Sequence, residues 1–414
     1  LIEAVAERAD PSCAHFGGCS GCTMQHVEHS AQLRMKTETV RQRFQRALER
    51  EDVPVADCLG PHEPFGDRHR LALQIHELHG QLAGGLPRLR SGAPFELTEC
   101  PATDPAALRV ARAAVDAAHR LGIEAWNPRN DAGTLRAVIT RSNGAGDVVV
   151  TLVVRDARRG EHRALVDALC AEPIGARGVS VNVNPGGRDR LLGPRTEHAA
   201  GDAGIEESIG DTRFVLAHNG FFRSSRFTAA AVVETVQRLV EPNRDALVLD
   251  LYSGMGLLAL TLAPHTGRVV AIEEHPRAIH DAERSARANG LDNVEFRQTK
   301  VEGVLREFVG AGVHAVVLDP PPDGCGRFVL NALTKEVRPE RIVYTSSSLD
   351  AIAEDTAVLV QRGYNLQAVQ PIDAGPHTPA VECVVLCGRR LDKGKRVTSV
   401  AQARRLLRRL RGEG

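Results

Sequence analysis

The chain has 414 residues, of which 43% are hydrophobic and 25% are charged, and its formal net charge is zero. These values are typical of a globular protein with two to three domains, and a zero balance argues neither for nor against a polyanionic partner. No apolar run approaches the ~18 residues of a membrane span, so we expect no membrane passage. The first residues lack the basic and then apolar pattern of a signal peptide, which predicts a cytoplasmic location.

Four cysteines have a spacing that is typical of metal ligands. Cys13, Cys19 and Cys22 form a Cys-x5-Cys-x2-Cys run among glycines, and Cys100 follows 78 residues later, directly before a proline. Because the chain has nine cysteines, an odd number, and is expected in a reducing compartment, a disulfide framework is not predicted. Structural zinc usually has two short cysteine hooks, whereas a cysteine before proline recurs in iron–sulfur ligation. The spacing alone leaves zinc and an iron–sulfur cluster open.

The front half of the chain predicts mixed α and β structure. Breaker-poor stretches of helical composition occupy residues 25–50, 104–121 and 161–169. Apolar runs or alternations predict strands at residues 71–78, 135–141, 148–154 and 179–183. Gly, Pro and Asn cluster at residues 184–187 and 202–204, which indicates loops near a domain boundary that we place at residue 210.

From about residue 245, short apolar strands alternate with helices. Strands are predicted at residues 246–249, 269–272, 294–296, 313–318 and 341–344, followed by a strand pair at 366–369 and 381–386. This alternation predicts an α/β fold, with a doubly wound Rossmann-like domain at 211–390 behind an α+β domain at 1–210. Residues 388–414 contain ten Lys or Arg against two acidic residues, so we expect a basic helix at 391–414. Its arginines either contact phosphates or form a solvated face.

A cofactor site is predicted where the first of these strands ends. Asp250 closes the strand and is followed by Tyr252, Gly254 and Gly256, whose glycines allow close approach of a ligand to the backbone. Glu273 ends the next strand, where an acid can accept hydrogen bonds from ribose hydroxyls. A carboxylate at Asp250 would repel a pyrophosphate but would suit the ammonium and sulfonium groups of S-adenosylmethionine, which is therefore favoured over NAD and ATP.

These residues together resemble the bacterial RNA uridine-5 methyltransferases of the TrmA/RlmD type. The match runs through most of the chain and includes the cysteine run with residues 21–26, residues 66–70, Cys100-Pro101, residues 250–256, Asp319-Pro320-Pro321, and residues 342–346, 362–364 and 371–382. The resemblance implies a [4Fe-4S] cluster on the four cysteines and structured RNA, either rRNA or tRNA, as partner of a monomeric protein. It also implies S-adenosylmethionine at Asp250, Tyr252, Gly254, Gly256, Glu273, Asp319 and Arg223, the last of which stands where the family has glutamine.

The catalytic pocket departs from the family pattern. In that family a cysteine thiolate adds to carbon 6 of uracil, carbon 5 takes the methyl group, and a carboxylate, here Glu382, removes the carbon 5 proton. Ser347 stands at the position of that cysteine, and Cys325, in a loop that we expect to be flexible, is the alternative thiol. Cys383 adjoins Glu382 but should point to the opposite face of its strand. Lys300 replaces an acid that the family places near the adenine.

Three hypotheses follow from these departures. The chain is a methyltransferase whose chemistry Ser347 or Cys325 supports, or a pseudoenzyme that serves as an RNA-binding or partner-binding module. A third possibility is a methyltransferase that acts on a different target atom, for which no covalent addition is needed.

Overall fold

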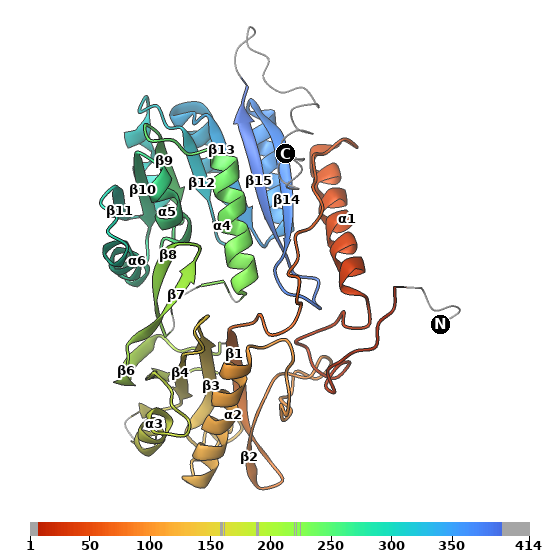
Figure 1. Cartoon of the computed structure of the whole chain (residues 1–414), viewed down its shortest axis with the longest axis vertical. Helices are drawn as coiled ribbons and strands as arrows, with labels where there is room; N and C mark the ends of the chain where they lie inside the picture. Colours follow the sequence, from red (N-terminus) through yellow and green to blue (C-terminus); the bar gives the residue numbers. More distant parts are fainter. Residues whose placement is uncertain are drawn as a thin grey trace.

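The computed structural model describes residues 7–390 except residues 158–159, 161, 188–189, 219, 221 and 224. Two large β-sheets lie one above the other along the long axis of the molecule, and a short hairpin stands between them (Figure 1). The basic helix expected at 391–414 lies outside the described residues. Among the helices that are described, none is both long enough and apolar enough to cross a membrane.

The first sheet has six strands in the order β2-β1-β3-β4-β5-β6. Its strands are β1 (Arg70–Leu78), β2 (Gln81–Gly85), β3 (Leu135–Ser142), β4 (Val148–Val154), β5 (Gly178–Val183) and β6 (Arg195–Gly201). The central strands β3 and β4 are rich in β-branched residues and are buried along their whole length. Apolar side chains of α2 (Pro105–Arg120) and α3 (Arg163–Cys170) complete the core of this sheet.

Helix α2 begins with a side-chain cap. The Oδ1 atom of Asp104 accepts hydrogen bonds from the backbone N–H groups of Ala106 (2.9 Å) and Ala107 (3.3 Å), and Oδ2 pairs with Arg226 at 3.0 Å. We expect Asp104→Ala to lower stability by about 1–2 kcal/mol, because two N–H groups lose their acceptor.

Thermal unfolding of the Asp104→Ala and Asp104→Asn variants separates the cap from the ion pair. Asparagine caps a helix as well as aspartate does but carries no charge, so Asp104→Asn should lose less than half as much stability. Equal losses in the two variants would show that the ion pair to Arg226, and not the cap, carries the effect.

The hairpin of β7 (Gly204–Ile209) and β8 (Thr212–Ala217) follows the first sheet. Its apolar side chains Ile205, Phe214 and Leu216 are buried in the same core as α4 (Arg226–Val240). Residue 210, where we expect the boundary between the two domains, is the glycine in the turn of this hairpin, with a φ of 56°. The division into units 1–210, 211–390 and 391–414 stays a prediction.

The second sheet has seven strands in the order β11-β10-β9-β12-β13-β15-β14, of which the first five run parallel. Its strands are β9 (Leu247–Leu251), β10 (Arg268–Glu273), β11 (Val294–Gln298), β12 (Ala315–Leu318), β13 (Arg341–Ser346), β14 (Tyr364–Asp373) and β15 (Val381–Arg389). The helices that connect or flank these strands are α5 (Leu257–Leu262), α6 (Pro276–Ala288), α7 (Val301–Val304), α8 (Gly326–Ala332) and α9 (Leu349–Gln361). Strand order reverses beside β9, where doubly wound sheets bind ligands.

Both faces of this sheet are covered. Leu249 and Leu251 of β9 face a core that includes α8 and α9, whereas Val248 faces the core that includes α4 and α5. Continuous apolar strands such as Ala315–Leu318 are therefore buried on both sides, as parallel strands require. The predicted doubly wound, Rossmann-like α/β fold is confirmed.

Helix α1 (His29–Leu48) precedes the first sheet in sequence but packs beside β14 of the second (Figure 1). Its Val40 and Phe44 are fully buried in the core of that sheet. The Nζ atom of Lys36 lies 2.5 Å from Oδ1 of Asp373, and His29 reaches the other oxygen of the same carboxylate at 3.0 Å. The amino-terminal segment is thereby attached to the strand that leads toward the predicted site.

Candidate functional site

The chain turns sharply where β9 ends and α5 begins. Tyr252, Gly254 and Gly256 have φ angles of 63°, 54° and 83°, in the left-handed region that suits glycine. Tyr252 adopts this conformation at a cost of order 1–3 kcal/mol, and such strain clusters at ligand-binding turns. A Cβ atom at Gly256 would lie 3.2 Å from Leu260 and 3.3 Å from Ala282 of α6, which is a tight contact, and the positive φ would strain any other residue there. The turn opens at the switch point of the sheet.

Asp250 lies beneath this turn and is almost completely buried. Its Oδ2 accepts a hydrogen bond from the backbone N–H of Ala259 at 2.8 Å, whereas no described donor reaches its buried Oδ1. Burial, followed by the nearby carboxylate of Asp319, raises the pKa of Asp250 to about 8. A buried carboxylate oxygen without a donor fits a ligand that brings an N–H group, and best of all a cation.

Glu273 ends β10 beside the same turn. Its Oε2 accepts from the backbone N–H of Gly254 at 2.9 Å, and its Oε1 accepts from the N–H of His275 at 2.8 Å. Each carboxylate oxygen keeps a further lone pair, so the side chain can still accept hydrogen bonds from a ligand. The structure brings Asp250, the glycine turn and Glu273 together as the sequence predicts, because the ends of adjacent parallel strands share one edge of a sheet.

A second polar group lies next to Asp250. Asp319 follows β12, Thr345 belongs to β13 and Glu382 belongs to β15. The Nη2 atom of Arg223 donates to Asp319 Oδ2 at 3.1 Å, to Glu382 Oε1 at 2.9 Å and to Thr345 Oγ1 at 3.4 Å. Thr345 in turn donates to Glu382 at 3.0 Å. Because the side chains of Arg223 and Glu382 are each only 9% exposed, this is a buried ion pair.

The charges of this group stabilise one another. Burial disfavours the Arg223 cation, but the carboxylates of Asp319 and Glu382 outweigh that cost and raise its pKa. Burial raises the pKa of Asp319 to about 6, even though the arginine opposes this shift. Arg223 is therefore a permanent cation that spans two carboxylates from separate strands.

The four cysteines of the predicted metal site line one cavity. Cys13, Cys19 and Cys22 come from the loop before α1, and Cys100 comes from the segment before α2. Burial raises the pKa of both Cys13 and Cys19, and the neighbouring thiols add to that increase. Within the described residues, no three His, Cys, Asp or Glu side chains form a group that could hold a metal ion.

Polar groups surround these sulfur atoms. The hydroxyl of Thr103 donates to the sulfur of Cys100 at 3.2 Å. Arg68 donates to the sulfur of Cys22 at 3.6 Å, to the carbonyl of Gly21 at 3.0 Å and to the carbonyl of Pro376 at 3.2 Å. Arg68 thus connects the cysteine loop to the turn between β14 and β15, the strand that carries Glu382.

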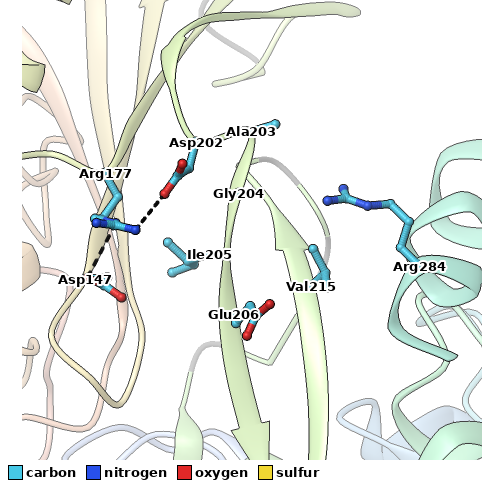
Figure 2. A pocket seen from close by; sticks show the side chains of 9 residues that line it. All are labelled: Asp147, Arg177, Asp202, Ala203, Gly204, Ile205, Glu206, Val215 and Arg284. Carbon is cyan, nitrogen blue, oxygen red and sulfur yellow. Dashed lines mark ion pairs between the residues drawn. The ribbon is translucent and has the colours of Figure 1, made fainter. Parts of the chain in front are cut away.

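Another cavity, of about 400 Å³, lies beside the hairpin (Figure 2). Arg177 pairs there with Asp202 at 3.0 Å and with Asp147 at 3.7 Å, while Arg284 of α6 lies on the opposite wall (Figure 2). These charged side chains are largely exposed, and exposed pairs of this kind contribute little to stability. None of the predicted site residues lines this cavity.

Comparison with known proteins decides the family. Residues 242–319 match the family model described as a methyltransferase domain. An uncharacterised RNA methyltransferase of Halalkalibacterium halodurans is 30% identical over 389 residues, which cover 93% of this chain and 85% of the relative. The chain belongs to the TrmA/RlmD-type RNA methyltransferase family. A further uncharacterised RNA methyltransferase, from Bacillus cereus, is 30% identical over 385 residues, or 92% of this chain and 84% of the relative.

A solved tRNA methyltransferase has the same fold. The crystal structure of the Pyrococcus abyssi tRNA (uracil-54, C5)-methyltransferase, in complex with S-adenosyl-L-homocysteine, matches with a TM-score of 0.73 at 25% sequence identity. The match covers 94% of this chain and 88% of that chain. The resemblance that the sequence motifs indicate is therefore confirmed.

Two residues that depart from the family pattern lie on the surface. Ser347 follows β13 and is exposed, and none of the described residues forms a hydrogen bond with its hydroxyl. Lys300 is exposed at the start of α7. The position of the family's nucleophile thus carries a hydroxyl that forms no hydrogen bond with any base among the described residues.

The prediction that Cys325 lies in a flexible loop, where its thiol could reach the site, is wrong. Cys325 is 4% exposed and belongs to the core beneath the sheet. Its backbone N–H donates to Asp355 at 2.9 Å, and the hydroxyl of Tyr344 donates to the same carboxylate at 2.8 Å. Burial and the Asp355 carboxylate raise the pKa of the Cys325 thiol, which disfavours the reactive thiolate.

The remaining placements agree with the alternation of strand residues. Cys383 and Cys387 are buried in the core on one face of β15, whereas Val384 and Leu386 belong to the core on the other face. Glu382 has the parity of Val384 and so points away from Cys383, as expected. The sequence analysis does not predict Thr345 as a site residue. Its position beside Ser346, within the matched residues 342–346, is the sequence feature that could have indicated it.

Proposed function

We propose that the chain binds S-adenosylmethionine and transfers its methyl group to RNA. The observation that carries this proposal is the buried Oδ1 of Asp250 beneath the glycine turn, to which no donor of the described residues forms a hydrogen bond. Asp250 suits the ammonium group of the methyl donor, and Glu273 suits the ribose hydroxyls. S-adenosylmethionine supplies an electrophilic methyl group on sulfur. Tyr252, Gly254 and Asp319 would surround the bound methyl donor.

RNA is the proposed acceptor because the relatives are RNA methyltransferases and the solved neighbour acts on tRNA. Arg68, one of two arginines in the matched stretch 66–70, already donates to the cysteine loop and to Pro376. Arg70 is half-buried, has no carboxylate within ion-pair distance among the described residues and is the better candidate for a phosphate contact.

Two measurements on the full chain test this function. Isothermal titration should detect binding of S-adenosylmethionine and of S-adenosylhomocysteine. Incubation with tritiated methyl donor and in vitro transcripts of tRNA and 23S-type rRNA should then label one class of RNA. Absence of heat in the titration would contradict the proposal, because every methyltransferase hypothesis requires the donor to bind.

A pseudoenzyme is the second candidate. It is supported by the exposed Ser347, whose hydroxyl has no described base, and by the ion pair of Arg223 with Glu382, the family's proton-abstracting carboxylate. In that case the fold would serve as an RNA-binding or partner-binding module. RNA that shifts in a native gel without acquiring a methyl group would favour this candidate.

We also propose that Cys13, Cys19, Cys22 and Cys100 hold a [4Fe-4S] cluster. The proposal is supported by the convergence of four thiols on one cavity and by the hydrogen bonds that reach three of the sulfurs, which tune such clusters. The cluster would connect the amino-terminal loop to a segment 78 residues away and stabilise both.

We expect Cys100→Ser to abolish the cluster. Protein purified without oxygen should contain about four irons per chain and show a broad visible absorbance, and the variant should lose both. Cys170→Ser is the matched control, because this thiol lies in α3 and away from the cavity. Zinc in place of iron in the wild-type protein would contradict the cluster assignment.

A further inference from the structure

No described thiol is placed to attack a uracil ring. All nine cysteines of the sequence lie in the described part of the chain. Four of them line the cysteine cavity, and Cys170 belongs to α3 beside the first sheet. Cys58, Cys325, Cys383 and Cys387 are buried, and burial raises the pKa of each thiol.

Carbon 5 of uracil depends on such a thiol. This carbon is a poor nucleophile until a covalent bond at carbon 6 makes it enolate-like, so an enzyme without a nucleophile cannot methylate it by that route. Ser347 stands where the nucleophile is expected, but its hydroxyl is exposed and contacts no described base. A serine hydroxyl stays protonated at neutral pH unless a base activates it.

The buried group around Arg223 is suited to another kind of acceptor atom. Glu382 and Asp319 both accept hydrogen bonds from the guanidinium of Arg223. Buried carboxylates of this kind can accept an N–H hydrogen bond and then the proton. The Nε of Arg223 is buried and donates to no described group, so one donor of this side chain remains without a partner. The side chains around Arg223 therefore include both acceptors and a donor, the two kinds of group that recognise the edge of a nucleobase.

We propose that the methyl acceptor is a nucleobase nitrogen that carries a hydrogen, such as a ring imide or an amino group, and that the transfer is direct. This inference rests on the proposed function. The nitrogen lone pair forms the new bond to the methyl carbon as the carbon–sulfur bond breaks, and the electron pair of that bond remains on sulfur. The nitrogen gives up its proton to the carboxylate of Glu382. No bond between protein and base is formed, so no thiol is needed.

Arg223 has a positioning role in this reaction. It fixes the position of Glu382 through the hydrogen bond that it donates to Oε1. Its guanidinium also neutralises one of two adjacent carboxylates, Asp319 and Glu382, which otherwise repel each other in a buried site. A glutamine, the family's residue, would provide no charge at this position.

Mass spectrometry of labelled nucleosides tests the acceptor atom. The full chain is incubated with S-adenosylmethionine carrying a CD3 group and with unmodified tRNA and rRNA transcripts, and the RNA is digested to nucleosides. We expect the label in an N-methylated nucleoside. Label in 5-methyluridine would overturn this inference and leave the proposed function standing. Unlabelled RNA, with donor binding intact, would overturn both.

A second measurement does not depend on turnover. In RNA that contains 5-fluorouridine, an enzyme that adds covalently to carbon 6 becomes trapped, because fluorine cannot leave as a proton does. We expect the wild-type chain to form no adduct on a denaturing gel, whereas Ser347→Cys, which introduces a thiol at the family's position, should form one. An adduct of the wild-type chain would overturn the inference.

The role of Glu382 has its own readout. We expect Glu382→Gln to lower kcat for methyl transfer by about 100-fold or more and to leave the Kd of S-adenosylmethionine unchanged, because a general base acts only in the chemical step. The matched Thr345→Val variant removes a neighbour of Glu382 that is not needed as a base, and should lower kcat far less. An unchanged kcat in Glu382→Gln would contradict the assignment of the base.

Discussion

Replacing Asp250 by asparagine is expected to weaken S-adenosylmethionine binding by about 30-fold or more. The change removes one partner of a buried, hydrogen-bonded charge pair, a loss that costs about 2–5 kcal/mol. Asparagine keeps an acceptor for the N–H of Ala259, so the turn should stay folded. Titration calorimetry of both proteins with S-adenosylmethionine measures the effect. Asp245→Asn, at the exposed opposite end of β9, is the matched control and should bind normally.

The same carboxylate predicts a pH dependence of binding. Because its pKa is raised to about 8, Asp250 is mostly protonated at pH 6 in the free protein. The ammonium of the ligand requires the ionised form, so binding releases a proton and the affinity should rise by up to tenfold per pH unit between pH 6 and pH 8. Titrations in buffers with different ionisation enthalpies count the released protons. A pH-independent affinity would contradict this role of Asp250.

The stability of the folded chain should fall as the pH rises, whereas the affinity for the methyl donor should increase. A folded-state pKa above the unfolded value means that the folded chain binds more protons, so this group makes stability fall as pH rises from about 4 to about 8. Asparagine removes the titration. The Asp250→Asn variant should therefore be less sensitive to pH and more stable than the wild type at pH 8, while it binds the methyl donor poorly. A side chain that is retained for ligand binding is expected to show this pattern, in which its replacement raises stability but weakens binding.

The donor half of the site could be read from the sequence because it depends on local patterns. A buried apolar strand, two glycines and an acid after the next strand fix Asp250 and Glu273 at one sheet edge, whatever the rest of the fold does. Strands with a continuous apolar run were found for the same reason. By contrast, β6 was missed because Arg195–Gly201 is polar and mostly exposed, and it becomes a strand only by pairing with β5.

The acceptor half depends on contacts between distant residues. Arg223 meets Asp319 and Glu382, which lie 96 and 159 residues further along the chain, and no local pattern encodes such a bridge. The same holds for α1, whose amphipathic sequence does not specify the sheet on which it packs. Cys325 was misplaced because a glycine-rich loop suggests exposure, whereas Asp355 anchors its backbone N–H inside the core.

Replacing Arg223 by methionine is expected to destabilise the protein by about 3–5 kcal/mol at pH 8. Methionine roughly fills the volume of the arginine stem but leaves the carboxylates of Asp319 and Glu382 without a cation, and removing one partner of a buried ion pair has a cost of this size. Urea unfolding at fixed pH measures the loss. Arg223→Lys retains the charge without the planar fork of donors, so its loss should be smaller.

The loss in Arg223→Met should also depend on pH. The Asp319 pKa is already about 6 with the arginine present, and without the cation it must rise further, because two carboxylates then face each other. The folded state would bind more protons than the unfolded state up to higher pH, so the variant should regain stability on acidification from pH 8 to pH 6. Adding Glu382→Gln to Arg223→Met removes the repulsion and should restore stability at pH 8. If Arg223→Met lost the same stability at pH 6 and at pH 8, the two carboxylates would have moved apart into solvent. That result would contradict the view that Arg223 holds them together.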